Sequence, residues 1–190
     1  MVAPPLRRIR IFYSFPDNMN SYVAAAKTIV ERCNSRWERN HTISVRSITY
    51  KDLPSGYEKS GVHEYLLRNL FDEFEIYCGF MGPHFGTPSG TFGSGTEEEY
   101  SFALRLHEAG GAVRHVMFGF CEAPINPFAI DPAQLTKAQE FRRVIGEKQL
   151  YFVWNSKTDF STKFEQQMDE LTYKFANDPN YFVRGGVRYK

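Results

Sequence analysis

FEIYCGFMG, residues Phe74–Gly82, is an apolar run with the length and the residue types of a β-strand. Four other runs share these properties, namely Ile9–Phe15, Thr42–Tyr50, Arg114–Cys121 and Gln149–Asn155. The sequence therefore predicts five strands, distributed along most of the chain.

Segments with apolar residues at helical spacing separate and follow these strands. They are Asn20–Trp37, Val62–Phe71, Glu97–Gly111, Asp131–Glu147 and Asp159–Asp178. The last of them places its large apolar side chains on one face, which we expect to be buried: Phe160, Phe164, Met168, Leu171 and Phe175.

Residues typical of helix ends flank three of these segments. Asp17 or Asn18 is predicted to cap the first helix, because short polar side chains accept hydrogen bonds from first-turn N–H groups. Asp131 followed by Pro132 is typical of a helix start, and Gly110–Gly111 of a helix end.

Strand and helix alternate five times, which favours a parallel sheet covered by helices on both faces. Right-handed crossovers leave few topologies. We expect an α/β protein with a flavodoxin-like three-layer α/β/α architecture and five parallel strands in the order 2-1-3-4-5. Residues 1–176 would form this single domain, and residues 177–190 a C-terminal extension or linker.

The composition is that of an ordinary globular domain. The 190 residues carry a net charge of +1, which gives no electrostatic indication of nucleic-acid or membrane binding. Cys33, Cys78 and Cys121 are scattered, so we predict reduced thiols, no metal site and a cytoplasmic location. No stretch of the sequence is typical of a signal peptide or a membrane span.

A ligand site is predicted where the strand order reverses, between the first and third strands. The loop after the first strand is FPDNMN, residues 15–20, and the loop after the third is the glycine-rich stretch PHFGTPSGTFGSGTEEEY, residues 83–100. Topology thus places Glu97, Glu98 and Glu99 at the site. Neither loop has the spacing of a phosphate-binding P-loop or a Rossmann fingerprint.

Two interpretations of the three glutamates remain open. Thr96 and Glu99 fit a capping box, with Thr96 at the cap and Glu99 at the third helical position. Alternatively, a glutamate is a reagent, and the glycines allow the backbone to approach a bulky ligand. His84 lies in the same loop, and its position is typical of a solvated histidine.

Several motifs resemble those of a bacterial TIR (Toll/interleukin-1 receptor) domain of the immune effector branch. IFYSF at Ile11–Phe15 resembles the opening strand, YKDLPSG at Tyr50–Gly56 the BB loop, and EIYCGFMG at Glu75–Gly82 the third strand. GTEEEY aligns Glu99 with the catalytic glutamate of enzymatic TIR domains. Gly95, Thr96 and Glu99 are also similar to a motif of the nucleoside deoxyribosyltransferases, in which the glutamate is the nucleophile.

The resemblance implies an NAD⁺ glycohydrolase that releases nicotinamide and ADP-ribose or a cyclic isomer, with NAD⁺ as substrate and no cofactor. Glu99 would be the catalytic carboxylate, with Glu98 as second choice. The expected substrate contacts are Phe15, Pro16, Asp17, Phe85, Gly86, Gly95 and Thr96, and the expected gate or assembly segment contains Asp52, Leu53, Pro54 and Gly56.

The resemblance also implies a biological setting. This would be antiphage immunity, with a homo-oligomer formed through TIR–TIR contacts and a sensor or regulatory partner. The alternatives are a nucleoside deoxyribosyltransferase or nucleotide N-glycosidase, and a TIR module that acts only by protein–protein contacts.

Overall fold

The computed structural model describes residues 5–52, 74–89 and 92–177. Five parallel strands form one sheet in the order β2-β1-β3-β4-β5, which confirms the predicted topology. The strands are β1 (Arg7–Ser14), β2 (Ile43–Ile48), β3 (Ile76–Met81), β4 (His115–Cys121) and β5 (Phe152–Trp154).

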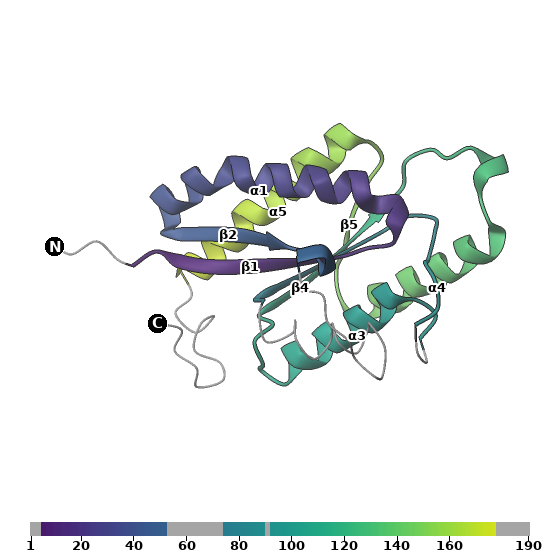
Figure 1. Ribbon diagram of the computed structural model, residues 1–190, viewed down its shortest axis with the longest axis horizontal. Coiled ribbons are helices and arrows are strands. Elements are labelled where there is room, and N and C mark those ends of the chain that lie inside the picture. The colour runs from purple at the N-terminus through teal and green to yellow at the C-terminus, as the bar shows by residue number, and fades with distance from the viewer. Residues whose placement is uncertain (1–4, 53–73, 90–91, 178–190) are drawn as a thin grey trace.

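Helices cover both faces of this sheet. Those described are α1 (Asn20–His41), α3 (Gly95–Glu108), α4 (Pro132–Lys148) and α5 (Lys157–Asn177), with short 3-10 turns at Asp17–Met19, Tyr50–Asp52 and Pro127–Ala129. Figure 1 shows α1 and α5 on one side and α3 and α4 on the other, as the three-layer prediction required. The helix predicted at residues 62–71 and nearly all of the extension predicted at 177–190 lie outside the described residues.

Each face of the sheet has its own aromatic core. The core under α1 and α5 includes Tyr13, Phe80, Phe164 and both tryptophans, Trp37 and Trp154. The five α5 residues predicted to share a face are all buried in it. The core under α3 and α4 is formed by another set: Phe12, Phe74, Tyr77, Tyr100, Phe118 and Phe141.

Gly79 at the centre of β3 makes the second core possible. A Cβ atom placed on this residue would lie 2.2 Å from the ring of Phe118 on the neighbouring strand β4. No Cβ atom fits at that distance, so the glycine makes room for the Phe118 ring beside β3.

The predicted helix ends were confirmed in two places and wrong in one. Asp131 caps α4, accepting hydrogen bonds from the N–H groups of Ala133 and Gln134, and Pro132 is the first helical residue. Gly110, just after α3, has a φ of +72°. Neither Asp17 nor Asn18 caps α1, because both lie in the 3-10 turn before it and Met19 occupies the cap position without a side-chain hydrogen bond.

The strands β2, β3 and β5 are shorter than the predicted runs, and the difference is largest in β5. The apolar run Gln149–Asn155 contributes only Phe152–Trp154 to the sheet, because Gln149 already terminates α4. Cys33 and Cys78 are buried free thiols, whereas Cys121 is half-buried at the end of β4. Within the described residues, no helix has the length and apolar character needed to cross a membrane, and no three metal-binding side chains gather.

Candidate functional site

A cavity of about 310 Å³ opens at the carboxyl ends of β1 and β3, where the strand order reverses. We name it the switch-point cavity. Four segments supply its walls: the end of β1 with the turn after it, the turn after β2, the glycine-rich loop, and the start of α3. Its lining residues are Tyr13, Ser14, Phe15, Pro16, Asp17, Tyr50, His84, Gly86, Thr87, Ser94, Gly95, Thr96 and Glu99. The position agrees with the one predicted from topology.

Glu99 is the buried carboxylate of this cavity. It lies in α3 and is only 8% exposed. The hydroxyl of Ser14, the last residue of β1, donates a short hydrogen bond to its Oε2 atom. Ser14 is fully buried as well, so strand and helix hold the carboxylate between them.

The helix cap is formed by other residues, so the capping-box interpretation of Thr96 and Glu99 is wrong. Ser94, not Thr96, is the cap of α3, and its side chain accepts a hydrogen bond of 3.1 Å from the N–H of Glu97. The Glu97 carboxylate reaches back to the N–H of Gly93 at 2.8 Å. Glu97 therefore occupies the third helical position that had been assigned to Glu99, and Glu99 has no part in capping.

Burial changes the acidity of Glu99. Loss of solvation raises its pKa from an ordinary 4.5 to about 7, and the nearby charge of Glu98 adds to the increase, whereas the hydrogen bond from Ser14 opposes it. Tyr77 lies beneath the same helix turn, and its hydroxyl donates to the carbonyl of Thr96 at 3.4 Å. Burial, followed by the charge of Glu99, also holds the pKa of Tyr77 well above its ordinary value. Because the pKa of Glu99 is about 7, its protonated and ionised forms coexist near neutral pH.

The glycine-rich loop is anchored to α4 by one side chain. The Oε1 atom of Gln134 accepts hydrogen bonds from the N–H groups of Phe85 and Gly86 at 2.9 and 3.0 Å, and its Nε2 atom donates to the carbonyl of Gly86 at 3.3 Å. Gly86 has a φ of +107°, a conformation that favours glycine. This tether fixes the part of the loop that carries His84, Gly86 and Thr87 into the cavity wall.

Most predicted site residues meet in the cavity, and three described ones do not line it. The ring of Phe85 is buried beneath the loop, where it packs edge-on against Phe141 with ring centroids 5.6 Å apart. Glu98 follows the cavity-lining turn but is not part of the wall. Asp52 accepts hydrogen bonds from the N–H and hydroxyl of Thr49 and from Lys27, and thereby closes the turn after β2. Leu53, Pro54 and Gly56 lie outside the described residues.

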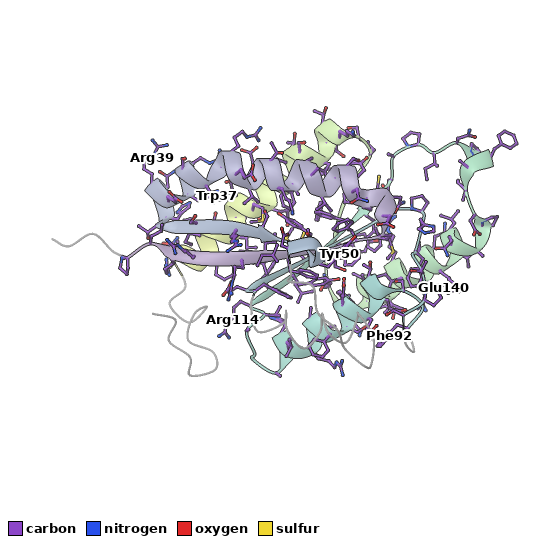
Figure 2. All side chains as sticks on the ribbon, viewed as in Figure 1. Trp37, Arg39, Tyr50, Phe92, Arg114 and Glu140 are labelled. Atoms are coloured by element: carbon purple, nitrogen blue, oxygen red, sulfur yellow. The ribbon has the colours of Figure 1, made fainter. Side chains whose placement is uncertain are left out.

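Sequence reasoning missed several lining residues. Ser14 is the important one, because it contacts Glu99 directly, and its place as the last residue of a predicted strand at the switch point was the available signal. Tyr50, labelled in Figure 2, lies in the turn after β2, and its ring is 6.5 Å from that of Phe15. The correct cap of α3 was also predictable, since Ser94-Gly-Thr-Glu97 fits the capping-box spacing as well as Thr96–Glu99 does.

Comparison with known proteins does not identify a family. No family model and no curated protein matches the chain. Among solved structures, S. aureus homoserine dehydrogenase at pH 6.5 is similar over 78% of this chain and 32% of its own, with 11% identity and a TM-score of 0.39. The translation elongation factor SelB from Methanococcus maripaludis, in its apo form, is similar over 90% and 36%, with 7% identity and a TM-score of 0.45.

A third similar structure is an active-site mutant of a family two carbohydrate esterase from Clostridium thermocellum. It matches 94% of this chain and 66% of its own, with 16% identity and a TM-score of 0.31. The chain spans about a third of the length of the first two proteins. None of the three is a TIR domain or a deoxyribosyltransferase. Similarity this low carries no argument about activity, so the function has to be inferred from the cavity itself.

Proposed function

We propose that the protein is an NAD⁺ glycohydrolase whose catalytic carboxylate is Glu99, acting in antiphage immunity by depleting NAD⁺. The observation that carries this proposal is the buried Glu99 carboxylate, held by the Ser14 hydroxyl in a cavity at the switch point of the sheet. The TIR-like motifs place the catalytic glutamate of that family at the same residue.

Cleavage of the bond between nicotinamide and ribose is accelerated by one negative charge in a site from which water is largely excluded. When the bond between the nicotinamide nitrogen and ribose C1′ breaks, its electron pair stays on the nitrogen and neutralises the pyridinium. The ribose becomes an oxocarbenium-like cation. A carboxylate close to C1′ stabilises that cation, and burial strengthens the attraction because little water screens it.

A second catalytic group is not required for this leaving group. Nicotinamide leaves as a neutral molecule, so no general acid has to protonate it. Water then adds to C1′ and loses a proton, giving ADP-ribose, whereas attack by the adenine of the same molecule gives a cyclic isomer. Among the described lining residues Glu99 is the one buried carboxylate, which fits this reaction, and Asp17 in the same wall is available to bind ribose hydroxyls.

Glu99→Gln is the variant that tests the proposal. Gln keeps the size of the side chain and removes the charge that faces the cation. Release of nicotinamide from NAD⁺ should fall about a hundredfold or more. Glu97→Gln is the matched control, because it removes the same charge from the same helix while keeping an oxygen for the Gly93 N–H, and it should leave turnover nearly unchanged. Near-native turnover of a folded Glu99→Gln protein would refute the proposal.

The size of the cavity supports a second candidate. A volume of about 310 Å³ is at the lower end for small-molecule sites and suits a single nucleoside. Glu99 would then attack C1′ of a 2′-deoxyribonucleoside and form a covalent deoxyribosyl-enzyme as the bond between C1′ and the base breaks. The base leaves with the electron pair of that bond and takes up a proton from water. Release of base from deoxyribonucleosides but not from NAD⁺, with a deoxyribosyl adduct on Glu99 seen by mass spectrometry, would favour this reaction.

A further inference from the structure

A second cavity adjoins the switch-point cavity. Its volume is about 460 Å³, and Asp17 and His84 line both cavities, so the two share a border. The segment between β4 and α4, residues 122–131, supplies much of its wall and extends away from the sheet in Figure 1. We name this second space the arm cavity.

The walls of the arm cavity combine apolar surface with hydrogen-bonding groups. Ile125, Ala129 and Ile130 from the connecting segment and Pro83 from the glycine-rich loop provide the apolar part. Ile125 is 41% exposed, which is unfavourable for an isoleucine that nothing covers. The side-chain amide of Asn18 adds a polar group that both donates and accepts. A flat heteroaromatic base, apolar on its faces and polar at its edge, matches such walls.

Together the two cavities could hold a dinucleotide, with one nucleoside half in each. The switch-point cavity has room for about one nucleoside, so the other half of a dinucleotide bound at Glu99 must lie elsewhere. The linking diphosphate would cross the shared border, where the imidazole of His84 can donate a hydrogen bond to it. Asp17 at the same border can accept hydrogen bonds from ribose hydroxyls.

We propose that the arm cavity binds the adenosine half of NAD⁺ while Glu99 faces the nicotinamide ribose in the switch-point cavity. This inference rests on the proposed NAD⁺ glycohydrolase function and adds a subsite to it. It predicts that the enzyme distinguishes NAD⁺ from nicotinamide mononucleotide, which has the same scissile bond and lacks the adenosine.

Ala129→Trp is the test variant. Ala129 is exposed at the cavity wall, so a large side chain can fill the cavity without disturbing a core. The KM for NAD⁺ should rise about tenfold or more, a loss of about 1.4 kcal/mol of binding, because the indole occupies the space of the adenine, and kcat/KM for nicotinamide mononucleotide should stay unchanged. Ala24→Trp is the matched control, since Ala24 is an exposed residue of α1 that lines neither cavity, and it should affect neither substrate.

A binding measurement separates failure of the subsite from failure of the proposed function. AMP should bind to the wild-type protein and to Ala24→Trp in calorimetry, and binding should be lost in Ala129→Trp. If that pattern holds while NAD⁺ is not cleaved, the glycohydrolase proposal fails and the adenosine subsite stands. If NAD⁺ is cleaved but Ala129→Trp changes neither the KM for NAD⁺ nor AMP binding, or affects both substrates equally, the subsite is refuted. Thermal melts of both variants show that they are folded.

Discussion

Replacement of Glu99 by Gln should stabilise the protein at alkaline pH, although it removes a residue that we assign to catalysis. The folded protein holds the Glu99 proton with a pKa of about 7, against an ordinary value of 4.5 that applies to the unfolded chain. Between these two values the folded state keeps a proton that the unfolded state releases. The stability of the wild-type protein therefore falls as pH rises through this window, and the full cost is present above pH 7.

The magnitude follows from these two pKa values. Burying an ionised Glu99 costs about 3 kcal/mol of unfolding free energy above the window, and about 2.5 kcal/mol of this cost develops between pH 5 and pH 8. Gln has no charge to lose, so its contribution is the same at both pH values. The free-energy difference between Glu99→Gln and wild type should therefore shift by about 2.5 kcal/mol in favour of the variant on going from pH 5 to pH 8.

Urea unfolding at the two pH values, followed by far-ultraviolet circular dichroism, measures this difference directly. Titrating groups that do not interact with Glu99 contribute equally to both proteins and cancel. Glu97→Gln removes the same charge from a half-buried position and should not reproduce the pH-dependent gain. A Glu99→Gln advantage that is equal at pH 5 and pH 8, or larger at pH 5, would refute the assignment of Glu99 as a carboxylate that is destabilised by burial.

Three further predictions concern the site, the core and assembly. The rate of NAD⁺ cleavage should rise with pH around a midpoint near the Glu99 pKa of about 7, because only the ionised carboxylate stabilises the cation. Ser14→Ala should move this midpoint upward in a pH–rate profile, since it removes a hydrogen bond that favours the ionised form. An unchanged midpoint in Ser14→Ala would contradict the role given to that hydroxyl. Gly79→Ala should lower the free energy of unfolding by about 1–3 kcal/mol in urea titrations, because the added methyl group overlaps the Phe118 ring, and a neutral effect would mean that the ring can move aside. The TIR-like motifs predict that cleavage per molecule of enzyme increases with protein concentration as the domain assembles, and a strictly proportional dependence of total rate on concentration would count against an assembled site.

The fold was predictable from the sequence because its signals are long and repeated. Five apolar runs separated by amphipathic segments leave few arrangements, and the buried face of α5 was readable residue by residue. Short elements were harder. The run Gln149–Asn155 was predicted to be one strand, yet its first residue terminates α4 and only Phe152–Trp154 joins the sheet. The residue types of the run do not show where the helix ends and the strand begins.

The site was predictable in position but not in its contacts. Strand order alone placed the glutamates at the switch point, and Glu99 is indeed the one that faces the cavity. The capping-box interpretation placed the cap two residues too late, because Ser94–Glu97 and Thr96–Glu99 have the same spacing and only the backbone decides between them. Phe85 was predicted to contact the ligand. In the structure, its backbone N–H is bound by Gln134, a residue 49 positions away, and the Phe85 ring packs against Phe141 in the core.

The division of the aromatic side chains between the two cores has a spectroscopic consequence. Both tryptophans of the chain, Trp37 and Trp154, lie in the core under α1 and α5. Tryptophan emission therefore reports on the packing of that layer, and loosening of α3 and α4 alone would leave it almost unchanged. The helix α3, which carries Glu99, packs on the other core, which contains no tryptophan. Its opening therefore has to be followed by hydrogen exchange or by the near-ultraviolet circular dichroism of Tyr77 and Tyr100.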